Sequence, residues 1–372
     1  MVSTAPQAAA TPARAEGLRR FRFVWIVLTA AALAGVAVAS VVVGSRDVAL
    51  SDITAALGGS TDGFSQAAVA KRIPRTVLAV LAGAALGLSG AVMQGVTRNP
   101  LADPGILGVN TGASLAVVVA IATVGLTSAT GYIWVAIGGA TVTAVFVYVV
   151  GSLGRGGATP LKLALAGAAT SAALTSLISA VVLPRGDISG NVRSWLIGGV
   201  GGATYSSIGQ VAPFLAVGLA VSLLCARSLN SLALGDELAA GLGERVALAR
   251  GAAALGAVLL CGAVTAVTGP IGFVGLVVPH ACRLLIGVDH RWLLPLSAIL
   301  GAILLTATDV LGRIVARPEE IDVGIIPRSS AHPSSSTSSA DRRCASCDHA
   351  PVTSPDPCAG VGDRSKPAQT HR

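Results

Sequence analysis

The amino-acid sequence predicts an all-α polytopic membrane protein with nine transmembrane helices. Of its 372 residues, 53% are hydrophobic and only 12% are charged, whereas a soluble domain carries about a quarter charged residues. The mean hydropathy is +0.74. Most apolar residues are gathered in nine long runs, and about 20 apolar residues suffice to cross a bilayer as a helix.

The first apolar run, residues 23–44, contains no charged residue. The preceding residues 1–22 carry four arginines against one glutamate, which predicts a cytoplasmic N-terminal tail. A cleaved signal peptide is the alternative, although its apolar core would be shorter. Alternation then places residues 97–105, 226–245 and 287–292 on the cytoplasmic side. The eight further runs are 76–96, 107–124, 132–153, 161–183, 207–224, 246–268, 272–285 and 293–312.

The inventory of polar residues disfavours two classes of function. Ion-coupled carriers usually bind their ion with carboxylates deep in the membrane, and no Asp or Glu lies near the middle of any run. The runs also lack a nucleophile with its base, so no catalytic, cofactor-binding or metal-binding residue is predicted. The chain has no Gly-Lys pair, which the phosphate-binding loop of nucleotide hydrolases requires. Any ATP hydrolysis that drives transport therefore belongs to a separate polypeptide.

Several sequence blocks occur in one order between residues 20 and 325. They are RIPR (72–75), GAALGLSGAVMQGVTRNPLADPGILGVNTG (83–112), LALAG (163–167), RSWLIGG (193–199), GDELAAGLG (235–243), GPIGFVGLVVPHACRLLIGVDHRWLLP (269–295) and RPEEIDVG (317–324). In these blocks the chain resembles the FecCD-type permeases of ABC importers for iron-siderophores, haem and cobalamin. The resemblance implies ten helices per subunit and a homodimer or heterodimer around one pathway. It also implies cytoplasmic ATPase subunits, which use the ATP, and an extracytoplasmic substrate-binding protein.

The resemblance further implies where the ATPase binds. The cytoplasmic block GDELAAGLG would form short coupling helices that seat in the ATPase, and two acidic residues at a helix start suit the positive end of the helix dipole. An ordinary acidic cap on a solvated loop is the alternative. The candidate coupling residues are Gly235, Asp236, Glu237, Ala240 and Gly243.

The resemblance also implies a docking site for the binding protein. In the family, arginines at the positions of Arg72, Arg75 and Arg313 receive its acidic residues, and charge pairs at an interface rim steer the encounter. Snorkelling to lipid phosphates is the alternative for these side chains. Pro74 restricts the residue before it and predicts an extended approach to the second helix.

The inner turn between the second and third runs contains Asn99, Pro100, Asp103 and Pro104. Its prolines would end one helix and start the next, and its Asn and Asp would supply caps; the family places this turn near the cytoplasmic exit. Thr159 and Pro160 precede the fifth run, which lines the pathway in the family, so a role at the inner gate is a weaker expectation. His280 has no nearby carboxylate and is expected to be a packed or capping group, not an iron ligand.

The family continues with a tenth helix, whereas this sequence changes abruptly after Ile326. Residues 327–372 are polar and low in complexity, which predicts a disordered tail from a shifted reading frame after a permease domain at 23–326. A Cys-x-x-Cys-x-His fragment in the tail has an incomplete zinc spacing and is ascribed to chance. Its residues, with one later cysteine, are Cys344, Cys347, His349 and Cys358.

These observations predict the permease subunit of an ATP-driven importer of iron(III)-siderophores in the bacterial cytoplasmic membrane. No nucleic acid is expected as a partner. The alternatives are a permease for cobalamin or haem, a non-functional truncated permease and, less favoured, a gradient-driven carrier. The preference for a siderophore rests on its frequency in the family and on no particular residue.

Overall fold

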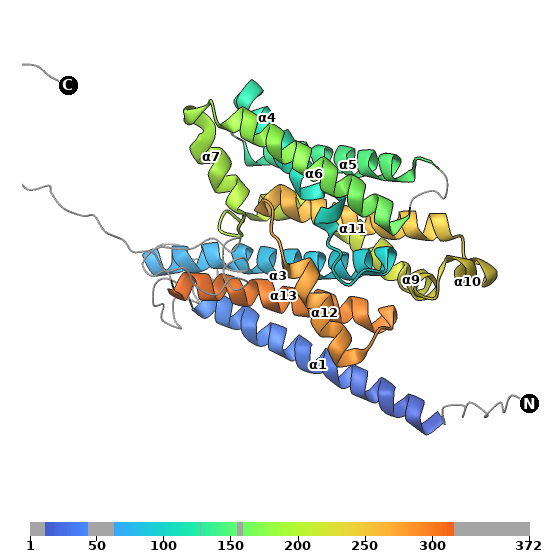
Figure 1. Cartoon of the computed structure of the whole chain (residues 1–372). Coiled ribbons are helices and arrows are strands. Elements are labelled where there is room, and N and C mark those ends of the chain that lie inside the picture. Colours follow the sequence, from blue (N-terminus) through green and yellow to red (C-terminus); the bar gives the residue numbers. More distant parts are fainter. Residues whose placement is uncertain (1–11, 44–62, 127, 155–158, 316–372) are drawn as a thin grey trace, which may run out of the picture. The chain divides into compact units, whose positions relative to one another are not determined.

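The computed structural model describes residues 12–43, 63–126, 128–154 and 159–315, and these ranges form helices joined by short turns (Figure 1). Each predicted apolar run coincides largely with one helix, so the predicted all-α fold is confirmed. The elements are α1 (Pro12–Val42), α3 (Phe64–Thr97), the 3-10 helix η1 (Pro104–Leu107), α4 (Val109–Val124), α5 (Ala129–Ser152), α6 (Pro160–Val182), α7 (Gly186–Ile197), α8 (Tyr205–Leu224), α9 (Ala226–Ala233), α10 (Asp236–Gly241), α11 (Val246–Thr268), α12 (Val274–Ile286) and α13 (His290–Val315).

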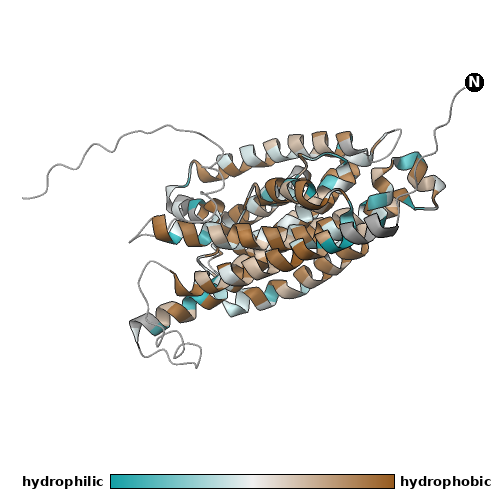
Figure 2. Cartoon of the chain, turned by 90° about the horizontal axis from the view of Figure 1, so that it is seen from below, coloured by the Kyte–Doolittle hydropathy of each residue, from teal (hydrophilic) through white to brown (hydrophobic). Residues whose placement is uncertain are grey.

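The predicted number of nine spans is not confirmed. Within the described residues, seven helices are long and apolar enough to cross a membrane, namely α1, α3, α5, α6, α8, α11 and α13. These helices are hydrophobic over most of their length (Figure 2). The apolar helices α4 and α12 have only 16 and 13 residues. A helix of 13 residues is about 20 Å long, which is short of a hydrocarbon core of about 30 Å.

The short α12 begins inside the bundle. Gly275 in its first turn lies so close to Gly90 of α3 that a Cβ on Gly90 would be 2.0 Å from the carbonyl oxygen of Gly275. The connection from α11, residues 269–273, is non-helical and includes the buried Ile271. Irregular backbone at membrane depth is tolerated where protein buries it, as here.

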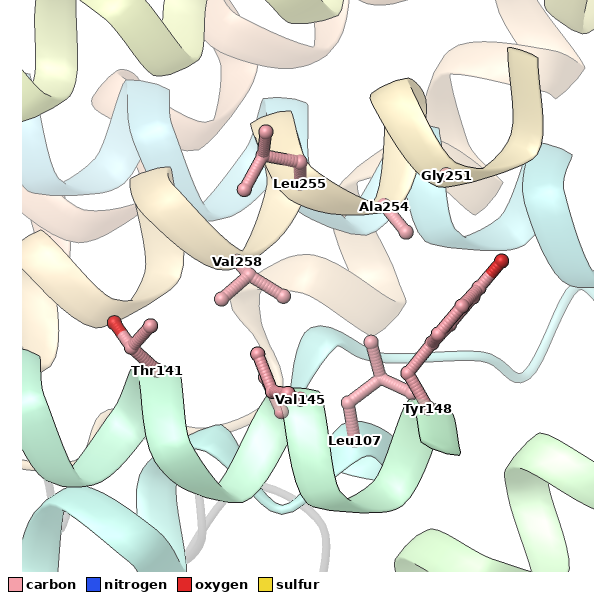
Figure 3. A pocket seen from close by; sticks show the side chains of 9 residues that line it. Leu107, Thr141, Val145, Tyr148, Gly251, Ala254, Leu255 and Val258 are labelled. Carbon is pink, nitrogen blue, oxygen red and sulfur yellow. The ribbon is translucent and has the colours of Figure 1, made fainter. Parts of the chain in front are cut away.

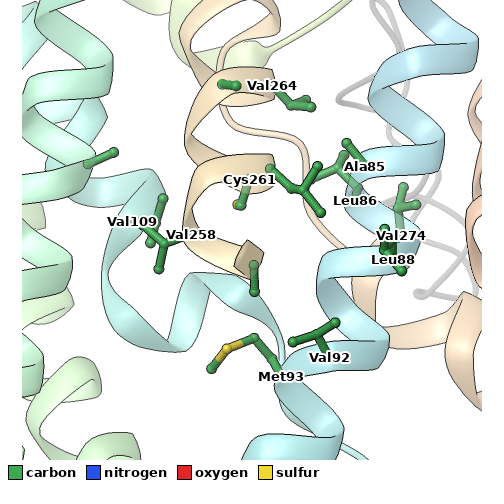
Figure 4. Packing of buried hydrophobic residues seen from close by; sticks show 14 of the residues in the cluster. Ala85, Leu86, Leu88, Val92, Met93, Val109, Val258, Cys261, Val264 and Val274 are labelled. Atoms are coloured by element: carbon green, nitrogen blue, oxygen red, sulfur yellow. The ribbon is translucent and has the colours of Figure 1, made fainter. Parts of the chain in front are cut away.

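Two helices, α3 and α11, form the centre of the bundle. In their most apolar windows 78% and 72% of the residues are buried, against 11% in α1 and in α6. Figure 4 shows Leu86 of α3 near Cys261 of α11, and both belong to the buried cluster. The remaining helices therefore cover a core that these two provide.

Glycines allow α3 and α13 to pack backbone against backbone. A Cβ on Gly83 would lie 2.3 Å from the carbonyl oxygen of Gly301, and a Cβ on Gly87 would lie 2.3 Å from that of Ser297. Close approach of this kind is a main source of helix association in lipid. Substitution of either glycine would force the two helices apart.

The helix α3 begins well before the second apolar run and contains Pro74 in its interior. The predicted extended approach is therefore wrong. An internal proline removes one backbone hydrogen bond, but tertiary contacts around it outweigh that local cost, since Arg72, Arg75 and Thr76 are buried and hydrogen-bonded. As a consequence, both arginines project from a helix and not from a loop.

Segments that the sequence assigns to the cytoplasmic side meet at one end of the bundle. Arg22 of α1 lies 3.4 Å from Asp289, and the Nδ2 of Asn230 in α9 donates to the same carboxylate at 2.8 Å. The opposite end of α1 contacts α3 and α13 through Val42 and Ser40. These two ends are called inner and outer below.

Candidate functional site

At the inner end, the short helix α10 and the turns on either side of it form a segment that we call the coupling elbow, residues 234–243. This segment directly follows α9. Gly235 and Gly243 have φ values of 114° and 86°, so both bends need a glycine. The predicted coupling residues are thus brought together on one short segment.

Asp236 joins this elbow to the rest of the bundle. Its Oδ1 accepts a hydrogen bond from Nη2 of Arg250 in α11 at 2.9 Å and another from Nη2 of Arg98. Arg98 has a left-handed backbone at the end of α3 and also donates to the carbonyl oxygen of Leu232 at 2.6 Å. Partial burial opposes ionisation of Asp236, but the charges and hydrogen bonds of Arg250 and Arg98 outweigh it and lower the pKa of Asp236.

The outer surface of the elbow is apolar. Leu234, Leu238 and Leu242 are 58%, 63% and 69% exposed, while Ala239 is fully buried beneath them. Among the predicted coupling residues, Glu237, Ala240 and Gly243 are exposed. Sequence reasoning missed the three leucines and Arg98, although the spacing of four between the leucines was a readable signal.

The inner turn has the predicted caps. The Oδ1 of Asn99 accepts from the backbone N–H of Leu101 at 2.9 Å, and the Oδ1 of Asp103 accepts from that of Gly105 at 2.8 Å. Pro100 is exposed, and Pro104 opens η1. Arg98 directly precedes this turn and donates a hydrogen bond to Asp236, so Arg98 links the turn to the elbow.

Thr159 and Pro160 start α6 as helix-initiating residues. The Oγ1 of Thr159 accepts from the backbone N–H of Lys162 at 3.4 Å, and Pro160 occupies the first turn, where its missing N–H is no loss. The helix α6 packs against η1 next to the inner turn. A role of these two residues in an inner gate stays a prediction.

At the outer end, two of the three arginines predicted to dock a binding protein pair with one aspartate, and the third bonds to the end of α1. Asp309 of α13 is fully buried and lies 2.9 Å from Nη2 of Arg75 and 2.9 Å from Nη2 of Arg313. Arg313 also donates to the hydroxyl of Ser40 at 2.7 Å, and Arg72 donates to the carbonyl oxygen of Val42 at 3.1 Å. This outer cluster ties α1, α3 and α13 together.

The arginines of the outer cluster are buried. Arg72 and Arg75 are each 7% exposed, and Arg313 is 1% exposed. Burial of a charge costs several kcal/mol unless it is paired and hydrogen-bonded, so the pairing of Arg75 and Arg313 with Asp309 has a structural role. Docking of a binding protein at these residues stays a prediction, and Asp309 is a partner that sequence reasoning located near the outer end without assigning it a role.

No metal centre occurs in the described ranges, where no group of three His, Cys, Asp or Glu side chains could hold an ion. The sequence predicts that His280 is a packed or capping group; it is exposed on α12, so the packed alternative is wrong. The fragment with Cys344, Cys347, His349 and Cys358 lies outside the described residues, as does the predicted disordered tail.

An apolar hollow of about 230 Å³ lies between α5 and α11 (Figure 3). Val145 and Tyr148 of α5 face Ala254, Leu255 and Val258 of α11 across it. No charged side chain lines this hollow, so it offers no electrostatic contact to a charged metal chelate.

Comparison with known proteins decides the family. The sequence pattern of the FecCD transport family matches residues 18–331. The chain belongs to this family. It is 43% identical over 255 residues to the iron(3+)-hydroxamate import system permease protein FhuB of Bacillus subtilis, which covers 68% of this chain and 66% of FhuB. It is 40% identical over 288 residues to the ferric enterobactin transport system permease protein FepD of Escherichia coli, covering 77% of this chain and 86% of FepD.

A solved structure supports the same assignment. A metal-chelate type ABC transporter in an inward-facing conformation superposes with a TM-score of 0.73 at 25% identity, over 83% of this chain and 96% of that one. This FecCD-family chain is therefore a multi-pass permease of the ABC-transporter type in the cytoplasmic membrane, a transport component and not an enzyme. Permeases of this type act with an ATPase and a substrate-binding protein.

Proposed function

We propose that the chain is a translocating subunit of an importer that carries iron(III)-siderophore complexes inward across the cytoplasmic membrane. Relatives that carry iron-hydroxamate and ferric enterobactin support this cargo class at 43% and 40% identity. A haem cargo is the second candidate, because the hemin transport system permease protein HmuU of Yersinia pestis is 39% identical over 260 residues.

The observation that carries the proposal is the contact of Asp236 with both Arg98 and Arg250. An ATPase that docks on the exposed leucines of the coupling elbow would move Asp236, and with it Arg98 at the end of α3. Arg98 would transmit the movement to the inner turn at Asn99 and Pro100, and Arg250 would transmit it to α11. The elbow thus connects an external source of energy to the two central helices.

At the outer end we propose that the acidic residues of a binding protein dock at Arg72, Arg75 and Arg313. The outer cluster supports this role by its position, since three cationic residues gather at one end of α1, α3 and α13. A carboxylate that approaches from outside would share these guanidinium groups with Asp309. Such charge pairs fix the register of an encounter more than its affinity.

Reconstitution tests the proposal. The chain, its ATPase and its second permease subunit are placed in proteoliposomes with binding protein loaded with a radioactive iron(III)-siderophore. We expect accumulation that requires ATP and the ATPase, and little accumulation of cobalamin or haem. Accumulation against a gradient without the ATPase would contradict the proposal, and preference for haem would favour the second cargo.

A further inference from the structure

A polar pocket of about 280 Å³ lies at the inner end of the bundle. It forms where the end of α3, the end of α12 and the start of α13 meet. Gln94, Arg98, Arg283 and His290 supply its polar side chains, and Val288 lines it as well. The lining holds two arginines and no carboxylate, so the pocket is suited to an anion.

Arg283 carries a charge that the pocket does not neutralise. Its guanidinium donates to the Oε1 of Gln94, a neutral partner, and within the described part of the chain no ion pair joins it to a carboxylate. Gln94 is fixed in turn, because its Nε2 donates to the carbonyl oxygen of Gly275 at 3.2 Å. A partly buried cation without a counter-charge favours an anionic ligand.

The histidine in the pocket is held in place by Asn230. Oδ1 of Asn230 accepts from the backbone N–H of His290 at 2.9 Å and lies 2.8 Å from its Nδ1, which makes Nδ1 the proton donor. The Nε2 side of the ring packs against Gly95, where a Cβ would lie 2.8 Å from Nε2. Since an unprotonated Nε2 is an acceptor, His290 shapes the pocket and supplies no donor to an anion, so Arg283 and Arg98 are the cationic groups of the site.

The surroundings of the pocket are amphipathic. Val288 is 73% exposed, and Leu101 and Leu284, neighbours of the lining residues Pro100 and Arg283, are 71% and 78% exposed. The pocket lies level with the ends of membrane-length helices, where lipid headgroups are found. Basic pockets between helices on the cytoplasmic side are suited to anionic headgroups.

We propose that the pocket of Arg98 and Arg283 binds a phosphate anion, supplied by an anionic lipid headgroup of the inner leaflet. The guanidinium of Arg283 would pair with the phosphate oxygens, and the exposed apolar side chains would contact the acyl chains. Arg98 also donates a hydrogen bond to Asp236 of the coupling elbow, so a lipid bound in the pocket would contact a residue that itself contacts the elbow. Such a site requires that the inner end of the bundle lie at the membrane surface, and it is independent of the cargo that the permease carries.

Binding to the purified full-length chain tests the site. Native mass spectrometry measures the affinity for phosphatidylglycerol and for the zwitterionic phosphatidylcholine, and titration calorimetry in phosphatidylcholine nanodiscs measures binding of inorganic phosphate. We expect Arg283→Gln to weaken phosphatidylglycerol binding about fivefold. Arg227→Gln is the matched control, since Arg227 is exposed on α9 at the same end; it should change the affinity less than twofold.

A second variant avoids any risk to folding. Val288→Glu places a carboxylate at an exposed position of the lining, where it would compete with a bound phosphate, and Val288→Gln is its neutral control. We expect only the glutamate variant to lose preference for phosphatidylglycerol. Size-exclusion profiles of all variants confirm that they remain folded.

Each outcome of these binding measurements either supports or overturns the proposed site. Loss of the lipid preference in Arg283→Gln and Val288→Glu alone supports a headgroup ligand. Binding of inorganic phosphate that needs Arg283, without a lipid preference, keeps the phosphate site and assigns it to a soluble source. Equal binding by all variants overturns the site. Loss of lipid binding by the wild-type chain on assembly with its ATPase would make the pocket part of a protein interface and would also overturn it.

Discussion

The two ends of the bundle use the same ion pairing in opposite surroundings. At the inner end, Asp236 sits between Arg98 and Arg250, and its side chain is 48% exposed. At the outer end, Asp309 sits between Arg75 and Arg313 and is fully buried. One aspartate between two arginines therefore occurs twice, once in contact with water and once without it.

The difference in burial gives the two clusters different mechanical properties. Exposed ion pairs contribute at most about 1 kcal/mol and exchange readily with water. Buried pairs have lost their hydration, so removal of one partner leaves an uncompensated charge at a cost of about 3–5 kcal/mol. The outer cluster is therefore a fixed clamp on α1, α3 and α13, whereas the inner cluster is an adjustable joint.

The largest effect is expected for Asp309→Asn. The substitution preserves size but leaves the buried guanidiniums of Arg75 and Arg313 without a carboxylate, so we expect a loss of about 3–5 kcal/mol of stability. Fluorescence-detected size exclusion after heating, on detergent-solubilised protein, measures it as a lower unfolding temperature. Asp236→Asn is the matched control. Equal unfolding temperatures for the two variants would break the comparison.

A smaller effect is expected for Ser40→Ala, which tests whether the clamp depends on its neutral partners. The hydroxyl of Ser40 accepts from Nη2 of Arg313 at 2.7 Å and lies 2.8 Å from the hydroxyl of Thr76. Removal of this buried acceptor should cost about 1–3 kcal/mol, read in the same assay. Ser176→Ala, at an exposed serine of α6, should leave the unfolding temperature unchanged.

Sequence reasoning found the local features of these clusters and missed their long-range partners. The caps at Asn99 and Asp103 and the bends at Gly235 and Gly243 follow from residue types in short windows, and the structure has them. The pairing of Arg75 with Asp309 joins residues 234 positions apart, which no periodicity encodes.

The error at Pro74 has a tertiary origin. Local preference predicted an extended segment before this proline, but packing of α3 against α1 and α13 kept the helix intact. The predicted count of nine spans is not confirmed, and its weakest member is α12, which begins inside the bundle and has only 13 residues. At both places long-range packing supplies information that a local window does not contain.

Asp236→Asn tests whether the inner cluster is a joint. It should cost less stability than Asp309→Asn, because the Asp236 side chain is half exposed, although that of its partner Arg250 is only 8% exposed. It should nevertheless reduce ATP-driven uptake several-fold, since it weakens the link from the elbow to Arg98 and Arg250. Transport in proteoliposomes measures the effect. Asp236→Glu, which keeps the charge, should retain more activity than the asparagine variant.

The smallest expected effect is the pH dependence of the inner pair. Arg250 and Arg98 lower the pKa of Asp236 in spite of its partial burial, so its contribution to stability is fully present above the unfolded-state value of about 3.9 and is lost as the pH falls through the lower folded-state pKa. The difference in unfolding temperature between wild type and Asp236→Asn should stay constant from about pH 8 to 5 and shrink in more acidic buffer. A difference that already disappears near neutral pH would mean that the carboxylate is not held by its two arginines, and the inner end would then have no joint to compare with the outer clamp.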